Sequence, residues 1–273
     1  EQSFASEMRE GLARSVQYEG FMRFRIGDLE QALAFLDWAE QEYREMENYR
    51  RVSKVLNLKA RIHRDRDIEG DTEEARVALK EALQLVEEVA DKYTIAECYL
   101  TYMILEYQES RKQQDRDKRL KYLSEAERWY RQGAQIVHQN EYTLLQAVYE
   151  GMLGNTLFDR LRLQARAGEK ADLIPAFDRY LEECRWGAHF EKRRFFRSLD
   201  LLMQRLSLLN SDQIRYYIGY MRQKWDQYKR EGKLPGQDGR GQESGLSAIT
   251  SEYIDDMHNF CDLVEEFSEY IAS

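Results

Sequence analysis

The feature that most constrains the fold is a six-position pattern that occurs twice in the sequence, 43 residues apart. It opens with Gly-Asp, and Glu, Ala, Leu and Ala follow at matching offsets. A looser third copy includes Leu123 and Ala126, and a fourth begins at Gly168. The matched positions are Gly27 and Gly70, Asp28 and Asp71, Glu30 and Glu73, Ala32 and Ala75, Leu36 and Leu79, and Ala39 and Ala82. A small residue midway along a helix lets its neighbour approach closely, so the repeat predicts stacked helix pairs.

Helical periodicity continues along almost the whole chain. Apolar residues recur at spacings of three and four, and no stretch shows sustained alternation typical of a strand. Only two prolines occur in 273 residues, Pro175 and Pro235, which favours long uninterrupted helices. We expect an all-α fold without a sheet. The predicted helices cover 5–26, 29–46, 49–67, 72–91, 93–112, 117–138, 142–167, 170–184, 187–208, 212–230 and 246–271.

The predicted helix ends carry recognisable boundary residues. At Gly27-Asp28 and Gly70-Asp71, glycine suits the left-handed end of one helix, and aspartate suits the cap of the next. Ser211 and Asp212 suit an N-cap before Ile214 in the same way. These boundaries divide the chain into consecutive helix pairs.

The distribution of charge and glycine predicts three parts. Residues 1–230 form the helical repeat domain, and 231–245 are rich in glycine and predict a flexible linker. Residues 246–273 predict an acidic amphipathic capping helix, because no Lys or Arg follows Arg240 while eight acidic residues do. This helix either closes the last helix pair or folds back over basic residues as an acidic mimic of a partner.

Composition excludes several functions. No apolar run is long enough to span a membrane, and no signal peptide is evident. The net charge is −9, and residues 1–240 are nearly neutral, so a nucleic-acid surface is not favoured. Cys98, Cys184 and Cys261 lie far apart, which predicts buried, reduced thiols and a cytoplasmic protein without a metal site. No phosphate-binding loop or hydrolase motif occurs, so we expect no cofactor.

The repeats resemble tetratricopeptide repeats. Gly20 stands at that family's first-helix glycine, Gly27 at its turn, and Ala32 and Ala39 at its second-helix alanines. The period exceeds the family's usual length, and the Gly-Asp-x-Glu-x-Ala opening is most similar to the repeat arrays of large signalling ATPases. The resemblance extends over residues 13–92, weakens over 93–185 and is absent beyond. It implies a right-handed solenoid of about five antiparallel helix pairs, serving as a scaffold or sensor in a signalling or defence assembly.

In such arrays the first helix of each pair lines a concave groove, and this implies a set of partner-binding residues. The set is Arg14, Gln17, Phe21, Phe24, Arg25, Lys54, Asn57, Arg61, Arg64, Tyr99 and Tyr102. Guanidinium and amide groups suit peptide carboxylates and amides, so a protein or peptide partner of acidic character is expected. We expect Lys54, Arg61 and Arg64 to be exposed. A solvated helix face with half-buried aromatic residues is the alternative interpretation.

Two other functions remain open. Arg131 and His138 have a spacing found in a family of helical ribonucleases, and residues 185–197 combine basic and aromatic side chains that suit single-stranded nucleic acid. A regulator that binds a short peptide is the other. The favoured hypothesis is a non-catalytic protein-interaction module that does not bind membranes or nucleic acid.

Overall fold

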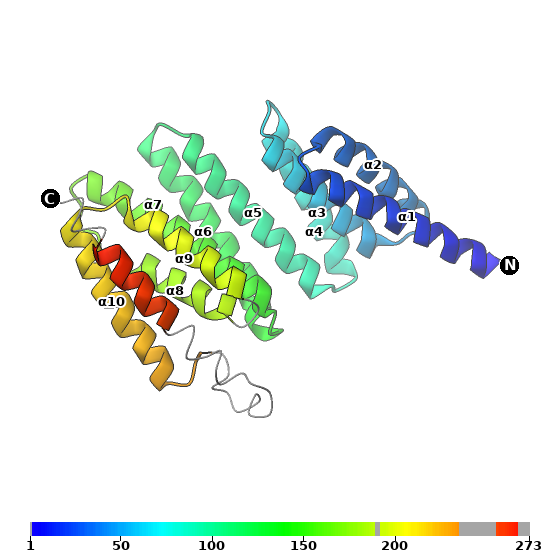
Figure 1. Ribbon diagram of the computed structural model, residues 1–273. Coiled ribbons are helices and arrows are strands. Elements are labelled where there is room, and N and C mark those ends of the chain that lie inside the picture. Colours follow the sequence, from blue (N-terminus) through cyan, green and yellow to red (C-terminus); the bar gives the residue numbers. More distant parts are fainter. Residues whose placement is uncertain (1, 189–191, 235–254, 267–273) are drawn as a thin grey trace, which may run out of the picture. The chain divides into compact units, whose positions relative to one another are not determined.

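A computed structural model describes residues 2–188, 192–234 and 255–266. Throughout these ranges the regular structure is helical and contains no strand, which confirms the predicted all-α class. The labelled helices are α1 (Gln2–Arg25), α2 (Leu29–Glu45), α3 (Tyr49–Arg66), α4 (Asp71–Glu88), α5 (Lys92–Lys112), α6 (Arg116–Gln139), α7 (Thr143–Arg166), α8 (Ile174–Ala188), α9 (Lys192–Leu206) and α10 (Ser211–Arg230). A further helical segment covers 255–266 (Figure 1).

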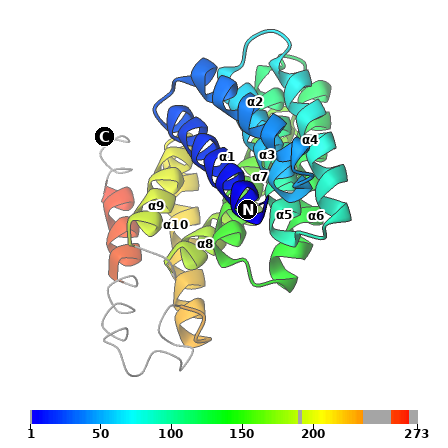
Figure 2. The same cartoon turned by 90° about the vertical axis from the view of Figure 1, so that its right-hand side faces the viewer.

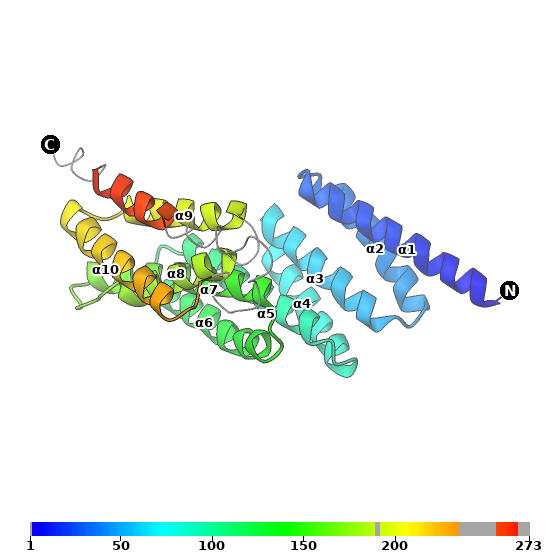
Figure 3. The same cartoon turned by 60° about the horizontal axis from the view of Figure 1, so that its bottom comes forward.

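The chain divides into two compact units, Glu1–Glu141 and Tyr142–Ser273. In unit 1, the helix pairs α1–α2, α3–α4 and α5–α6 follow one another, and α2 contacts α3 as α4 contacts α5. The first helices also contact in order, α1 with α3 and α3 with α5 (Figure 3). This arrangement is a helical solenoid; its predicted right-handedness stays a prediction.

The repeated small and large residues pack as the sequence pattern predicts. Ala32, Ala39, Ala75 and Ala82 are fully buried, and so are Leu36 and Leu79, the two leucines of the repeat. A Cβ added to Gly20 would lie 2.9 Å from Leu36 Cγ, so this glycine lets α1 approach α2 closely. The repeat is therefore a packing pattern that joins one helix to the next.

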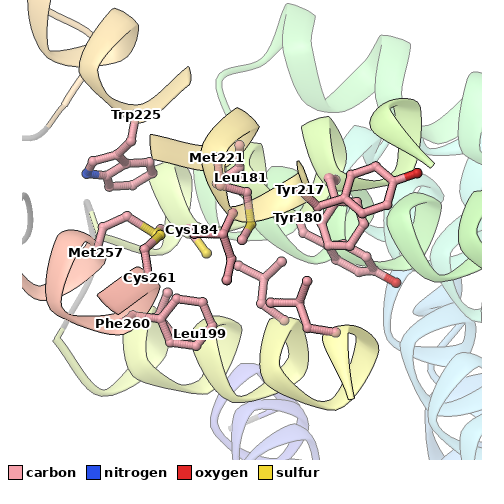
Figure 4. Close-up of a cluster of buried hydrophobic side chains, with 14 of the residues drawn as sticks. Tyr180, Leu181, Cys184, Leu199, Tyr217, Met221, Trp225, Met257, Phe260 and Cys261 are labelled. Atoms are coloured by element: carbon pink, nitrogen blue, oxygen red, sulfur yellow. The ribbon is translucent and has the colours of Figure 1, made fainter. Parts of the chain in front are cut away.

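Unit 2 begins with the α7–α8 pair, and both α9 and α10 contact α8. Segment 255–266 lies beside α9 and α10 (Figure 2). Its Met257, Phe260 and Cys261 are buried in one cluster with Leu199 of α9 and Trp225 of α10 (Figure 4). The described part of the C-terminal region thus covers the last helices of unit 2, as expected for a cap. Residues 246–254 and 267–273 of the predicted capping helix lie outside the described residues.

The predicted linker is described only at residues 231–234. Leu234 is buried in the unit 2 cluster, so the chain remains packed up to this point. The remainder, 235–245, lies outside the described residues. Its flexibility stays a prediction.

The structure confirms the two glycine turns and corrects the caps. Gly27 and Gly70 have φ values of 85° and 91°, which a Cβ disfavours. Asp28 makes no capping hydrogen bond to α2, and Asp71 lies inside α4, where it accepts from Arg66 and His63 at the end of α3. At α10 the cap is Asn210, which forms a capping box with Gln213, in place of the predicted Ser211 and Asp212.

The predicted helix 170–184 is placed four residues too early, and the predicted helix 187–208 is longer than the helix that the structure describes there. The first begins at Ile174 because Pro175 fits only the first turn of a helix, and it continues through Trp186 to Ala188. The second is shorter and covers Lys192–Leu206. The other boundaries in units 1 and 2 agree within a few residues where they are described.

All three cysteines are buried and free of disulfides, as predicted. Burial raises the pKa of Cys98 well above its usual range, and raises that of Cys261 to about 12. These thiols remain protonated at neutral pH. Among the described residues, no helix combines the length and apolarity required to cross a bilayer.

Candidate functional site

The first helices of unit 1 bring a cation and an aromatic ring together. Arg61 of α3 places its Cζ 5.5 Å from the centre of the Phe24 ring of α1. Both side chains are half-buried. A guanidinium over an aromatic face is held by electrostatic attraction to the ring. Two residues predicted from separate helices are therefore one contact in the structure.

Among the described residues, no carboxylate forms an ion pair with Arg61. Burial lowers the pKa of Arg61, and the positive charge of Arg64 lowers it further. Neighbouring cations are paired: Arg50 with Asp91 at 2.7 Å, and Arg64 with Asp65 at 2.7 Å. A half-buried cation without a counter-ion is costly, so this guanidinium is available to an incoming anion.

Glu97 of α5 faces the same cations and was not predicted. Burial raises the pKa of Glu97, although the positive charges of Arg61 and Lys54 oppose the shift. Lys54 itself lies 3.6 Å from Asp91. Glu97 follows Lys54 by 43 residues, the spacing of the sequence repeat, so carrying the repeat into α5 would have found it.

Asn57 joins α3 to α5 instead of facing a partner. Its side chain is buried, and its Oδ1 accepts a hydrogen bond from Thr101 Oγ1 at 2.9 Å. The bond fixes the spacing of the two helices beneath Arg61. We therefore assign Asn57 a positioning role.

The α1 residues of the predicted set differ in their surroundings. Arg14 and Arg25 are exposed, and Arg25 lies 6.0 Å from the centre of the half-buried Phe21 ring. Gln17 accepts a hydrogen bond from the Tyr43 hydroxyl of α2 at 3.0 Å. Arg25 also contributes to the positive potential at Arg61, so the α1 end of the site is basic.

Tyr99 and Tyr102 pack against Trp129 of α6. Their ring centres lie 5.7 Å and 4.4 Å from that of Trp129, and both pairs are stacked. Tyr102 is buried and donates a hydrogen bond to the Arg76 carbonyl. These rings stabilise the α5–α6 pair, so we leave Tyr102 out of the contact surface.

The expectation that Lys54, Arg61 and Arg64 are exposed is wrong. All three are half-buried, and the Arg64 side chain retains 11% of its accessible area. The physical reason is that α1 and α5 flank α3, so long basic side chains lie along neighbouring helices with only their ends in solvent. The core of the site is Phe24, Arg61, Lys54 and Glu97, flanked by Arg25 and Arg64.

The residues proposed for nucleic-acid chemistry are placed differently. Arg131 and His138 lie on the exposed side of α6. In the 185–197 segment, Arg185 pairs with Glu182 at 2.5 Å and lies 4.2 Å from the Trp186 ring, while Phe195 is buried. Residues 189–191 lie outside the described residues. These contacts engage the basic and aromatic side chains within unit 2.

No protein-family model matches this chain, and no curated protein matches it significantly. The described residues contain no group of His, Cys, Asp or Glu suited to holding a metal ion. The candidate site is therefore characterised by its own geometry. It offers a half-buried cation, an aromatic ring and a carboxylate of raised pKa, an arrangement that suits recognition of an anionic group beside an apolar one.

Proposed function

We propose that this protein is a non-catalytic, tetratricopeptide-like interaction module whose α1, α3 and α5 surface binds an acidic segment of a protein partner. The observation that carries this proposal is Arg61, a half-buried guanidinium that lies over Phe24 without an ion pair among the described residues. A carboxylate of the partner supplies the missing counter-ion, and Phe24 contacts an adjacent apolar group.

Three neighbouring charges set the preference for an acidic ligand. Lys54, Arg25 and Arg64 add positive potential around Arg61, while Glu97 opposes it. Protonation of Glu97 removes a negative charge from the site. Affinity for a carboxylate therefore increases as pH falls through the raised pKa of Glu97, until the ligand's own carboxylates become protonated.

The resemblance of the repeats to those of signalling ATPases supports a scaffold or sensor role. The packing of the first three helix pairs, with first helices side by side, suits binding of an extended segment across several helices. We propose that the assembly served is a signalling or defence complex.

A direct test uses an array of synthetic peptides that contain Glu or Asp beside Leu or Phe, with Gln and Asn versions as controls. Binding to the full chain is measured by fluorescence polarisation, and Arg61→Gln is compared with Arg111→Gln. Arg111 is an exposed arginine in the last turn of the same α5 helix that carries Glu97.

We expect acidic peptides to bind and Arg61→Gln to weaken them about tenfold or more, because a hydrogen-bonded charge pair contributes over 1 kcal/mol. Arg111→Gln should bind as the unmodified chain does. Equal binding by Arg61→Gln, or no preference for acidic over amide peptides, would contradict the proposed function.

A further inference from the structure

A second surface of unit 1 lies on its first helix pair, α1–α2. A pocket of about 510 Å³ opens between α1 and α2 and is lined by Val16, Gln31, Ala34, Phe35 and Trp38. One helical turn before Val16, Leu12 is 56% exposed, and Trp38 is 38% exposed. Large apolar side chains gathered around one pocket are typical of a surface that another molecule covers.

The second helix pair shows what covers this face when it has a neighbour. Aligning Gly20 with Ala60 places Leu12 at Val52 and Val16 at Leu56. Val52 and Leu56 are 0% and 4% exposed, and they share a core cluster with Ala39 and Tyr43 of α2. An α-helix therefore buries the equivalent positions of the next pair. In the first pair, the equivalent positions Leu12 and Val16 form a similar apolar surface on α1.

The charges beside that interface differ between the two pairs. Lys59 of α3 binds Asp37 and Glu40 of α2 at 2.6 Å and 2.9 Å. The residue of α1 that aligns with Lys59 is Glu19. A helix that lies on the first pair as α2 lies on α3 thus meets a carboxylate, which also pairs with Arg23 of α1 at 2.7 Å, where α2 meets an ammonium group.

On the α2 side of the pocket, the preference for a cation is the same in both pairs. Arg44 of α2 pairs with Glu81 of α4 at 2.7 Å, and the residue of α2 that aligns with Glu81 is Trp38. An indole face attracts a cation. Both flanks of the pocket therefore favour basic residues on the covering helix.

We propose that the pocket between α1 and α2 docks an amphipathic helix of a partner protein, with an aliphatic stripe and Lys or Arg along its flank. The described C-terminal helix of this chain does not fit, because 255–266 is acidic and its Met257, Phe260, Cys261 and Val264 are buried in unit 2. Helix-in-groove recognition supplies the apolar contact, and the flanking charges determine orientation. The proposal is independent of the Arg61 site.

The test uses a helix-stapled peptide with the 17-residue sequence of α2 in which Asp37 and Glu40 are replaced by Lys. The unmodified α2 sequence is the control peptide. Binding to the full chain is measured by calorimetry. We expect the lysine peptide to bind about tenfold more tightly at low salt, with the difference narrowing as salt screens the charges.

The matched variants are Leu12→Glu and Val77→Glu, which change exposed apolar residues of α1 and α4. Leu12→Glu should weaken the lysine peptide about tenfold or more, and Val77→Glu should not, with the helical circular dichroism of both unchanged. Unchanged binding by Leu12→Glu, or equal affinity for the two peptides, would overturn the proposal. A dimer seen by sedimentation and lost in Leu12→Glu would also overturn it, since the occupant would then be a second copy.

Discussion

Units 1 and 2 each place an arginine over a phenylalanine, with different consequences. In unit 1, Arg61 lies 5.5 Å from the Phe24 ring and forms no ion pair within the described residues. In unit 2, Arg205 lies 5.5 Å from the Phe158 ring and also donates to Asn155 Oδ1, at 3.1 Å from Nε. The arginine is therefore hydrogen-bonded within unit 2, whereas in unit 1 it is the group that we propose binds a partner.

The difference shows that an arginine–aromatic contact does not itself indicate function. Asn155 is buried and already accepts from the Tyr180 hydroxyl at 3.0 Å, so Arg205 belongs to a network within unit 2. Asn57, one turn before Arg61 in α3, accepts from Thr101 of α5 instead. What distinguishes a site is the guanidinium whose hydrogen-bonding capacity the fold leaves for a ligand.

Both units place a glycine of the first helix against a large side chain of the second. In unit 1, a Cβ on Gly20 of α1 would lie 2.9 Å from Leu36 Cγ of α2. In unit 2, a Cβ on Gly154 of α7 would lie 2.7 Å from the Tyr180 ring of α8. The units differ in the large residue, which is aliphatic in unit 1 and aromatic in unit 2.

The ends of the two units provide the test with the largest expected effect. Residues 255–266 cover α9 and α10, whereas Leu12 and Trp38 of the first pair in unit 1 are exposed. Met257→Asp should destabilise unit 2 by about 3 kcal/mol or more, because it places a charge in the apolar cluster. Deleting residues 241–273 should cause aggregation for the same reason.

Leu263→Asp is the control for this cap, since Leu263 is exposed on the same helix. Urea unfolding monitored by circular dichroism compares the variants. A soluble deletion with unchanged stability and tighter peptide binding would show that the segment is autoinhibitory and not a cap.

Replacing a small packing residue of either unit with a larger one should produce the next largest loss of stability. Ala32→Leu, Ala75→Leu and Gly154→Ala should each lower the free energy of unfolding by about 1–3 kcal/mol through overpacking. Gly219→Ala of α10 is the control, because its Cβ would meet nothing within 4 Å, and it should be neutral or stabilising. Unchanged melting temperatures in the first three variants would show that these positions do not require small residues.

Replacing Arg205 and Arg61 in turn should distinguish an arginine that stabilises the fold from one that binds a partner. Arg205→Gln should cost about 1–2 kcal/mol of stability, because a buried acceptor loses its charged donor. Arg61→Gln should leave the free energy of unfolding unchanged or raise it slightly, since a half-buried charge is removed and no carboxylate of the described chain depends on it for an ion pair. Chemical denaturation of both variants provides the comparison. A larger loss for Arg61→Gln would make its role structural.

The smallest effect concerns Glu97, because its raised pKa fixes the direction in which stability changes with pH. A carboxyl group whose pKa is higher in the folded state stabilises the fold when protonated, and this contribution is lost as pH rises through the folded pKa. Glu97→Gln should therefore be slightly more stable than the unmodified chain at pH 7, and the difference should disappear in acid.

Glu73→Gln, which alters an exposed carboxylate of α4, is the matched control for this titration. Melting temperatures between pH 4 and pH 8 provide the measurement. A destabilised Glu97→Gln at pH 7 would mean that Glu97 forms an ion pair with Arg61 or Lys54 in solution.

Much of the fold follows from local pattern, and the packing explains why the pattern fades. Gly27, Ala32 and Leu36 recur 43 residues later because the same helix contact is repeated. In unit 2 the contact is made by Gly154 and Tyr180, so a search for second-helix alanines weakens there although the helices still pair. Pro175 marks the start of α8, yet periodicity placed the helix earlier because an amphipathic pattern has no sharp edge.

The sequence by itself determined the helices, their order, the buried alanines and the three buried cysteines, because these depend on periodicity and residue size along one chain. Tertiary structure alone decided which polar groups bond to neighbouring helices and which do not. Lys54, Arg61 and Asn57 look alike as polar residues of one helix, but Asn57 bonds to Thr101, Lys54 lies beside Asp91, and Arg61 is left over Phe24. Hydrogen-bond partners come from neighbouring helices, and no spacing within α3 encodes which neighbour supplies them.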